Sequence, residues 1–303
     1  TNSIKLSKDK DLLFQRYRAV PWLARTHSIT MLPSVAALKA LRKVKMNIAN
    51  RRAFVGFGDP YFNEDQALAA DKNLAHQVAT ASNVRGMPVK LRNRPKTRVV
   101  DSADLALLPR LPETGFELQS IAASMGSNPK NTIFLGRQAN EGRVKKMKLD
   151  GFRVLAFATH GLLSGQLKGP AEPALVLTPP EKATREDDGL LTASEVAQLK
   201  LNAEWVILSA CNTAAADTPG AEGLSGLAKA FFYAGARTLL VSHWYVVSEA
   251  AARLTTQMFD VLRGNPAIGR AEALRQSMMA LADMKYRSHP AFWAPFVVVG
   301  EGG

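Results

Sequence analysis

The chain has 303 residues, of which 47% are hydrophobic, and this is enough for one large core or two small ones. It has one cysteine, no signal peptide and no apolar stretch of about 18 residues, which excludes an internal disulfide and favours a cytoplasmic protein without membrane spans. The net charge of +13 lies in the first third of the chain, because residues 1–100 have 19 Lys/Arg and 6 Asp/Glu, whereas residues 101–303 have 20 of each.

This basic excess is concentrated in two clusters, at residues 5–45 and 85–98. The second cluster has no acidic residue and contains Pro88 and Pro95, so a solvated loop is expected there. Such a loop could bind an acidic partner or a polyanion. It has no aromatic side chains on which bases could stack, and nucleic-acid binding is therefore disfavoured.

Apolar runs of strand length alternate with amphipathic segments, which predicts βα units and a mostly parallel sheet. Strands are expected at residues 29–32, 53–57, 131–135, 153–158, 205–211, 236–242 and 296–299. Helices are expected at residues 33–43, 66–81, 111–125, 141–148, 193–199, 224–234, 249–263 and 267–284. Thr192 is expected to cap the helix that follows it. Residues 161–188 are interpreted as a long Gly/Pro-rich excursion from the sheet.

The single cysteine and one histidine occupy similar positions in this pattern. Cys211 ends the apolar run Trp205-Val-Ile-Leu-Ser-Ala-Cys211, and His160 ends a similar run 51 residues upstream. If the two strands are neighbours, both side chains face the crevice beyond the carboxyl ends of a parallel sheet. A thiol with a pKa of about 8.5 needs a nearby base or positive charge to attack a carbonyl at neutral pH, and an imidazole provides one. A core cysteine is the alternative, and the strand-end histidine favours the nucleophile.

The neighbours of these two residues add to the hypothesis. Gly161 would let a substrate carbonyl approach closely, and its N–H could donate into an oxyanion hole together with that of Cys211. Asp217 and Glu222 lie in the segment after the cysteine, where an acid would either bind a basic substrate side chain or hold the loop. No cluster of metal ligands and no cofactor motif is present: Gly56-Phe57-Gly58 runs into a turn at Asp59-Pro60 rather than into a phosphate-binding loop.

Several unusual strings occur in order along the chain: Leu32-Pro33-Ser34, Ala158-Thr159-His160-Gly161, Asp188-Gly189-Leu190-Leu191-Thr192, Leu208-Ser209-Ala210-Cys211-Asn212-Thr213, Glu222-Gly223-Leu224-Ser225-Gly226-Leu227-Ala228, Gly235-Ala236-Arg237 and Trp293-Ala294-Pro295-Phe296. With these strings the chain resembles the CHAT family of caspase-like cysteine peptidases over about residues 28–303. The spacing of about 50 residues between histidine and cysteine is typical of caspases.

The resemblance implies a caspase-like α/β fold, a three-layer sandwich with a mostly parallel central sheet flanked by helices. It also implies that His160 is the base, that Cys211 is the nucleophile, and that peptide bonds of a protein substrate are hydrolysed through an acyl-enzyme. The resemblance further implies a place at the C-terminal end of a longer protein, often after tetratricopeptide repeats, so an upstream repeat or other regulatory domain is a possible partner. Residues 1–27 are accordingly interpreted as a possible remnant of an upstream segment, and residues 28–303 as the peptidase domain.

One string departs from the family pattern. Ser242-His243-Trp244-Tyr245-Val246 has His243 where the family more often has Leu. In caspase-like folds the segment after this strand lines the substrate cleft, so the resemblance implies that His243 and Trp244 contact substrate. Two other functions stay open at this point: a catalytically silent or regulatory module that docks a partner through its basic N-terminal part, and polyanion binding through Arg92, Arg94 and Arg98.

Overall fold

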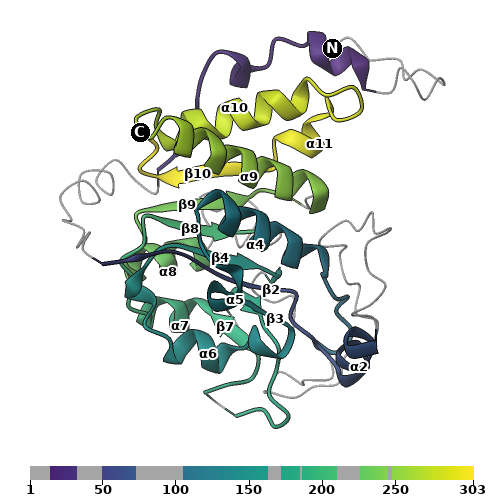
Figure 1. The fold of residues 1–303 in the computed structure, drawn as a ribbon, viewed down its shortest axis with the longest axis vertical. Coiled ribbons are helices and arrows are strands. Elements are labelled where there is room, and N and C mark those ends of the chain that lie inside the picture. Colours follow the sequence, from purple (N-terminus) through teal and green to yellow (C-terminus); the bar gives the residue numbers. More distant parts are fainter. Residues whose placement is uncertain are drawn as a thin grey trace.

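A computed structural model describes residues 14–32, 50–72, 105–162, 172–184, 186–209, 226–244 and 248–303. Within these ranges, seven strands form one central sheet: Thr30–Met31 (β1), Arg52–Gly58 (β2), Ile133–Leu135 (β3), Phe152–Ala158 (β4), Trp205–Leu208 (β8), Thr238–Ser242 (β9) and Phe296–Gly300 (β10). Their order is β1-β10-β9-β8-β4-β2-β3 (Figure 1). The strands β2, β3, β4, β8 and β9 run parallel, whereas β10 is antiparallel to β9 and parallel to β1.

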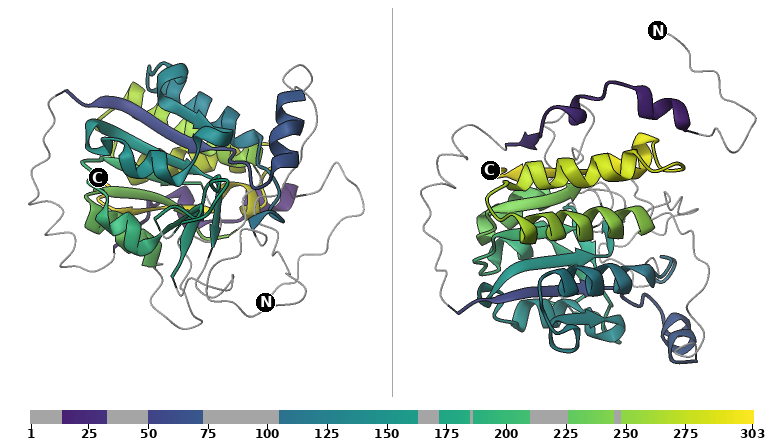
Figure 2. Two further views of the ribbon diagram at one scale, coloured as in Figure 1. Left: turned by 90° about the horizontal axis from the view of Figure 1, so that it is seen from below. Right: turned by 45° about the horizontal axis from the view of Figure 1, so that its top comes forward.

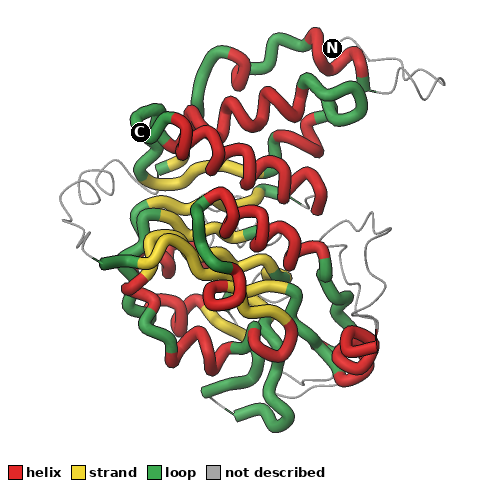
Figure 3. Tube along the Cα trace, viewed as in Figure 1, coloured by secondary structure: helices red, strands yellow, loops and turns green. Residues whose placement is uncertain are grey.

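Helices cover both faces of this sheet (Figure 3). One face packs against Glu113–Ser124 (α4), Ser248–Gly264 (α9) and Arg270–Ala282 (α10). The other packs against Glu141–Lys146 (α6), Ala193–Gln198 (α7) and Gly226–Ala234 (α8). The described residues also form the helices Glu64–Lys72 (α2), Pro129–Thr132 (α5) and Pro290–Trp293 (α11). The expected three-layer sandwich with a mostly parallel sheet is thus confirmed.

The central strands are buried on both faces, which explains why they read as continuous apolar runs. In β2, Phe54 packs into the cluster below α4 and α9, and Val55 packs into the cluster on the opposite face. In β4, Ala156 packs into the first of these clusters and Phe157 into the second. Each parallel strand therefore supplies both cores.

Most predicted elements are confirmed with small shifts at their ends. Thr192 caps α7 in a capping box, in which its side chain accepts from the Glu195 N–H and the Glu195 carboxylate accepts from the Thr192 N–H. The predicted strand at residues 131–135 is only partly right, because Asn128 and Pro129 start the short helix α5 before β3 begins. The predicted helix at residues 33–43, much of the helix expected at residues 66–81, and the basic cluster at residues 85–98 lie outside the described residues.

The predicted excursion at residues 161–188 is corrected by the structure. It contributes to a second sheet of three antiparallel strands, His160–Leu162 (β5), Ala174–Val176 (β6) and Leu190–Thr192 (β7). An apolar cluster holds this small sheet against the segment before α4; it consists of Phe62, Leu105, Leu108, Ala174, Val176 and Leu190, with Leu162 beside it. The side chains of β6 are fully buried, so this part of the excursion contributes to the core.

The N-terminal segment at residues 14–32 lies along the C-terminal helices (Figure 2, right). It comprises the 3₁₀ helices Gln15–Ala19 (η2) and Leu23–Arg25 (η3), followed by β1. The Trp22 ring meets that of Trp293 edge-on at 5.5 Å, and the Tyr17 ring meets that of His289 at 4.7 Å. Arg275 of α10 donates to the Arg25 carbonyl at 2.9 Å. The division of the chain at residue 27 stays a prediction.

Gly235, in the turn between α8 and β9, gives a test of this packing. Its φ is +112°, and a Cβ atom there would lie 2.3 Å from the Leu201 carbonyl oxygen. We expect Gly235→Ala to lower the free energy of unfolding by at least about 2 kcal/mol, because strain and overlap add. The matched control is Gly264→Ala, where a Cβ would meet nothing within 4 Å. Urea unfolding followed by circular dichroism should separate the two variants. Equal losses of unfolding free energy would contradict the close packing of Gly235 against the Leu201 carbonyl.

Candidate active site

The carboxyl ends of β2, β4, β8 and β9 meet at one edge of the central sheet, since these strands are parallel. The strands β4 and β8 are direct neighbours, and Phe157 pairs with Leu208 in their register. The two strands are therefore adjacent, as the proposed cooperation of His160 with Cys211 requires. His160 begins β5 immediately beyond this edge, two residues after the end of β4.

His160 is buried, with 5% of its surface exposed. Its Nε2 atom lies 2.8 Å from the carbonyl oxygen of Pro109, and its ring lies 5.4 Å from that of Phe62. A carbonyl oxygen can only accept a hydrogen bond, so Nε2 carries a proton and donates it. In the neutral imidazole the lone pair is then on Nδ1, and this nitrogen is the one able to act as a base.

The backbone at His160 is fixed by the small sheet. His160 pairs with Val176 of β6 in the antiparallel register, and the neighbouring Thr159 donates its hydroxyl to the Val176 carbonyl. Gly161 pairs with Leu175 in the same ladder. The second sheet therefore has a specific role, which is to turn the chain after β4 so that the imidazole lies at the carboxyl edge.

The carbonyl that receives His160 is itself anchored by a buried ion pair. Arg110, the residue after Pro109, donates from Nε and Nη2 to the two carboxylate oxygens of Asp59, at 2.8 Å and 2.6 Å. Asp59 follows β2 directly, is 4% exposed, and its N–H donates to the Thr114 hydroxyl at 2.7 Å. Burial raises the pKa of Asp59, and the hydrogen bond from Arg110 opposes that rise. Sequence reasoning gave Asp59 only a turn role and missed this pair.

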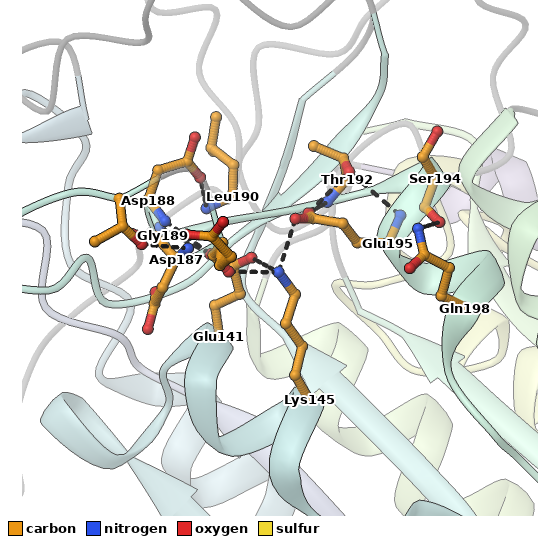
Figure 4. A network of polar contacts seen from close by, with 12 residues as sticks. Glu141, Lys145, Asp187, Asp188, Gly189, Leu190, Thr192, Ser194, Glu195 and Gln198 are labelled. Carbon is orange, nitrogen blue, oxygen red and sulfur yellow. Dashed lines mark hydrogen bonds and ion pairs between the residues drawn. The ribbon is translucent and has the colours of Figure 1, made fainter.

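A second polar network connects α6 to the segment just before β7 of the small sheet (Figure 4). The buried Glu141 of α6 accepts the N–H groups of Asp188 and Gly189 at 3.0 Å and 3.1 Å, just before β7. Lys145 bridges Glu141 and Glu195, and its Nζ lies 2.7 Å from the Glu195 carboxylate. Burial raises the pKa of Glu141 to about 7, with Lys145 opposing and Glu195 adding to the rise.

Two of the predicted substrate-binding residues follow β9 at the same edge. The His243 N–H donates to the Pro295 carbonyl at 2.8 Å, and burial lowers the pKa of its half-buried ring, which keeps it neutral at pH 7. Trp244 is 38% exposed, and its ring lies 6.2 Å from that of His243. Cys211, Asp217 and Glu222 lie outside the described residues.

Two further properties of the described ranges bear on the class of site. No group of three or more His, Cys, Asp or Glu side chains in them is arranged to hold a metal ion. Within the same ranges, no helix combines the length and the apolar character that a bilayer crossing requires.

Comparison with known proteins identifies the family of the chain. The model of the CHAT domain matches residues 9–301, and the chain therefore belongs to the CHAT domain family. It is similar to tetratricopeptide repeat protein 28 of Mus musculus and of Homo sapiens, with 34% identity over 114 residues in each case. That stretch is 37% of this chain and 4% of those proteins, so the similarity spans a small part of their length.

Similar solved structures include two of gingipain R, a cysteine proteinase. One is the complex of the pro- and mature domains of RgpB from Porphyromonas gingivalis, with a TM-score of 0.41, 13% identity, and coverage of 61% of this chain and 42% of that one. The other is the Arg-specific gingipain R, with a TM-score of 0.41, 14% identity, and coverage of 62% and 41%.

The Asp59–Arg110 pair generates one prediction. Arg110→Gln leaves a buried carboxylate without its partner, and we expect a loss of about 3 kcal/mol in the free energy of unfolding. The control is Arg253→Gln, which breaks an exposed pair with Glu249 and should cost less than about 1 kcal/mol. Urea unfolding at pH 7 measures both variants. The anchoring role is wrong if Arg110→Gln costs no more than the control.

The raised pKa of Glu141 generates a prediction about the pH dependence of stability. A carboxyl whose pKa is about 7 in the fold and 4.5 in the unfolded chain contributes stability that is present below pH 4.5 and lost as the pH rises through 7. Glu141→Gln removes this titration, so between pH 5 and pH 8 its stability should improve relative to the native chain by about 2 kcal/mol.

Glu204→Gln is the control for that pH dependence. Burial acts to raise the pKa of Glu204, but Arg153 and Arg51 lower it overall, so this carboxylate is ionised in both states across the range. Its stability difference from the native chain should stay constant between pH 5 and pH 8. If the stability difference between Glu141→Gln and the native chain is also constant over this range, the raised pKa of Glu141 is refuted.

Proposed function

We propose that this chain is a cysteine endopeptidase that hydrolyses peptide bonds of a protein substrate through a His160–Cys211 dyad. One observation supports the proposal above the others: β4 and β8 are paired neighbours, with Phe157 opposite Leu208. His160 and Cys211 each follow one of these paired residues by three positions in the sequence. Family membership supports the proposal as well, because the resemblance to the CHAT family implies that His160 is the base and Cys211 the nucleophile.

The proposed reaction follows from the protonation state of His160. Nδ1 accepts the thiol proton of Cys211, and the Nε2–H···O contact to Pro109 stabilises the imidazolium that forms. The thiolate attacks the scissile carbonyl and gives a tetrahedral oxyanion, which the N–H groups of Gly161 and Cys211 stabilise. Imidazolium then protonates the leaving amine, and a water molecule activated by Nδ1 hydrolyses the acyl-enzyme.

The proposal also assigns the substrate cleft and the partners. The peptide lies extended beside Trp244, whose exposed ring supplies apolar contact area, and beside the half-buried neutral His243. Asp217 and Glu222 select a basic side chain near the cut. The similarity to tetratricopeptide repeat proteins supports an upstream repeat or other regulatory domain in the full-length protein.

Because the chain has a single cysteine, alkylation by iodoacetamide reports on Cys211 alone. We expect the native protein to react at a pH well below the ordinary thiol pKa of about 8.5, because His160 stabilises the thiolate. In His160→Gln the rate at pH 6.5 should fall at least about tenfold, which corresponds to a pKa shift of about one unit or more. The control, His27→Gln, removes an exposed histidine of the N-terminal segment and should leave the profile unchanged.

Turnover is measured with fluorescein-labelled casein. The native protein should release peptides, and both Cys211→Ala and His160→Gln should lower the rate by at least about a hundredfold. A catalytically silent module predicts instead no turnover together with superimposable alkylation profiles for the native protein and His160→Gln. That pair of results would exclude the dyad.

A further inference from the structure

A cavity of about 690 Å³ opens at the opposite edge of the central sheet, where β2, β4 and β8 begin. Its walls are the amino ends of these strands, the last turns of α4 and α9, and the first turn of α10. The volume lies within the range of about 300–1,000 Å³ that small-molecule sites occupy. His160 lies six positions beyond Val154, the last residue of β4 that lines the cavity, which is roughly 20 Å along the strand. It is therefore distinct from the proposed peptidase site.

The floor of the cavity is apolar and aromatic. Trp205 of β8 and Phe259 of α9 meet edge-on, with their ring centroids 5.9 Å apart, and both are almost fully buried. Leu262 and Met125 extend this surface from α9 and from the end of α4. A floor of this kind fits an aliphatic or aromatic body.

Three arginines and one acid, Glu204, are the charged side chains among the described lining residues. The charge of Glu204 is satisfied, because Arg51 donates to it at 2.7 Å and Arg153 binds both of its oxygens at 3.2 Å and 3.1 Å. Arg263 is likewise engaged, donating to the Ser124 carbonyl and to Asp260 at 2.9 Å each. The charges of Glu204, Arg153 and Arg263 are therefore paired within the protein.

Arg270 differs from the other two. Its Nη1 lies 3.4 Å from the carbonyl oxygen of Glu301 and 3.6 Å from a carboxylate oxygen of the same residue, which Arg237 binds more closely at 3.0 Å. Burial lowers the pKa of Arg270, so these long contacts do not offset its desolvation. The guanidinium is 5.7 Å from the ring centre of Trp205, which places a cation beside the apolar floor.

The local helix geometry favours an anion at the same point. Arg270 is the first residue of α10, a helix of 13 residues whose N-cap, Gly269, has no capping side chain; the Ala271 N–H donates to the Gly302 carbonyl at 2.7 Å, and the helix dipole adds positive potential at this end. The acid of this first turn, Glu272, is bound by Arg275 through both oxygens at 2.7 Å each. Its charge is thus directed away from the cavity and toward the next turn.

We propose that this cavity is a binding site for a small amphipathic carboxylate, with the carboxylate on Arg270 and the apolar body on Trp205, Phe259 and Leu262. A carboxylate gives the guanidinium the close, charge-assisted partner that Glu301 supplies only at long range. The apolar body displaces water from the aromatic floor. Binding needs neither His160 nor Cys211, so the inference goes beyond the proposed peptidase function and stands or falls separately from it.

Isothermal titration calorimetry with sodium octanoate tests the site on the full chain. We expect saturable binding with one octanoate per chain. Affinity should fall at least about tenfold in Arg270→Gln, which is the loss of one charge-assisted contact. The matched control is Arg253→Gln on α9, an exposed arginine outside the cavity lining, and this variant should bind like the native chain.

Two further measurements separate the parts of the proposal. Ala123→Trp places a large ring in the cavity mouth at an exposed position, so it should abolish binding while the chain stays folded. The uncharged 1-octanol should bind at least about tenfold more weakly than octanoate. The proposal is overturned if octanoate gives no saturable heat with the native chain, if Arg270→Gln binds equally well, or if octanol binds as tightly as octanoate.

Discussion

The parallel pairing of β4 with β8 is the constraint on which the rest of the structure depends. Both strands are buried on two faces, and neighbouring side chains such as Ala156 and Phe157 enter opposite cores. A slip of one residue would exchange small and large side chains between two close-packed clusters, which fixes the register. The point at which each chain leaves the sheet is therefore fixed as well. The position of His160 follows from core packing before any polar contact is made.

The orientation of His160 depends on segments that are far apart in the sequence. The Pro109 carbonyl comes from the segment before α4, Phe62 from the segment after β2, and Val176 from β6. Each is tied down in turn: Arg110 binds Asp59, and Glu141 holds the backbone that enters β7. A flexible imidazole has two side-chain torsions to fix, and these contacts fix them through rigid elements. The buried carboxylates of Asp59 and Glu141 are each paired with a cation, Arg110 and Lys145, which offsets part of the cost of their desolvation.

The sequence predicts the central sheet and its helices because those elements have long periodic patterns. Thr192 could be assigned as a cap because a Glu follows it three residues later. The small sheet was missed because β5, β6 and β7 have three residues each, too few for alternation to be visible beside glycines and prolines. The Pro109 carbonyl has no sequence signature, since every residue has one, and Asp59 and Arg110 pair across 51 positions. Only the folded chain brings such groups together.

Arg110 at the carboxyl edge of the sheet and Arg270 at its amino edge differ in how closely their charges are paired, and α9 lies beside both edges. At the carboxyl edge, Asp59 and Arg110 bind each other at close range, whereas at the amino edge Arg270 has only long contacts. α9 begins four residues after Trp244 and ends beside the cavity, and it packs along α4 and α10. Seventeen helical residues span about 25 Å as one stiff body. α9 and β4 pack into the same close-packed core, so the helix is a second rigid connection between the two edges of the sheet.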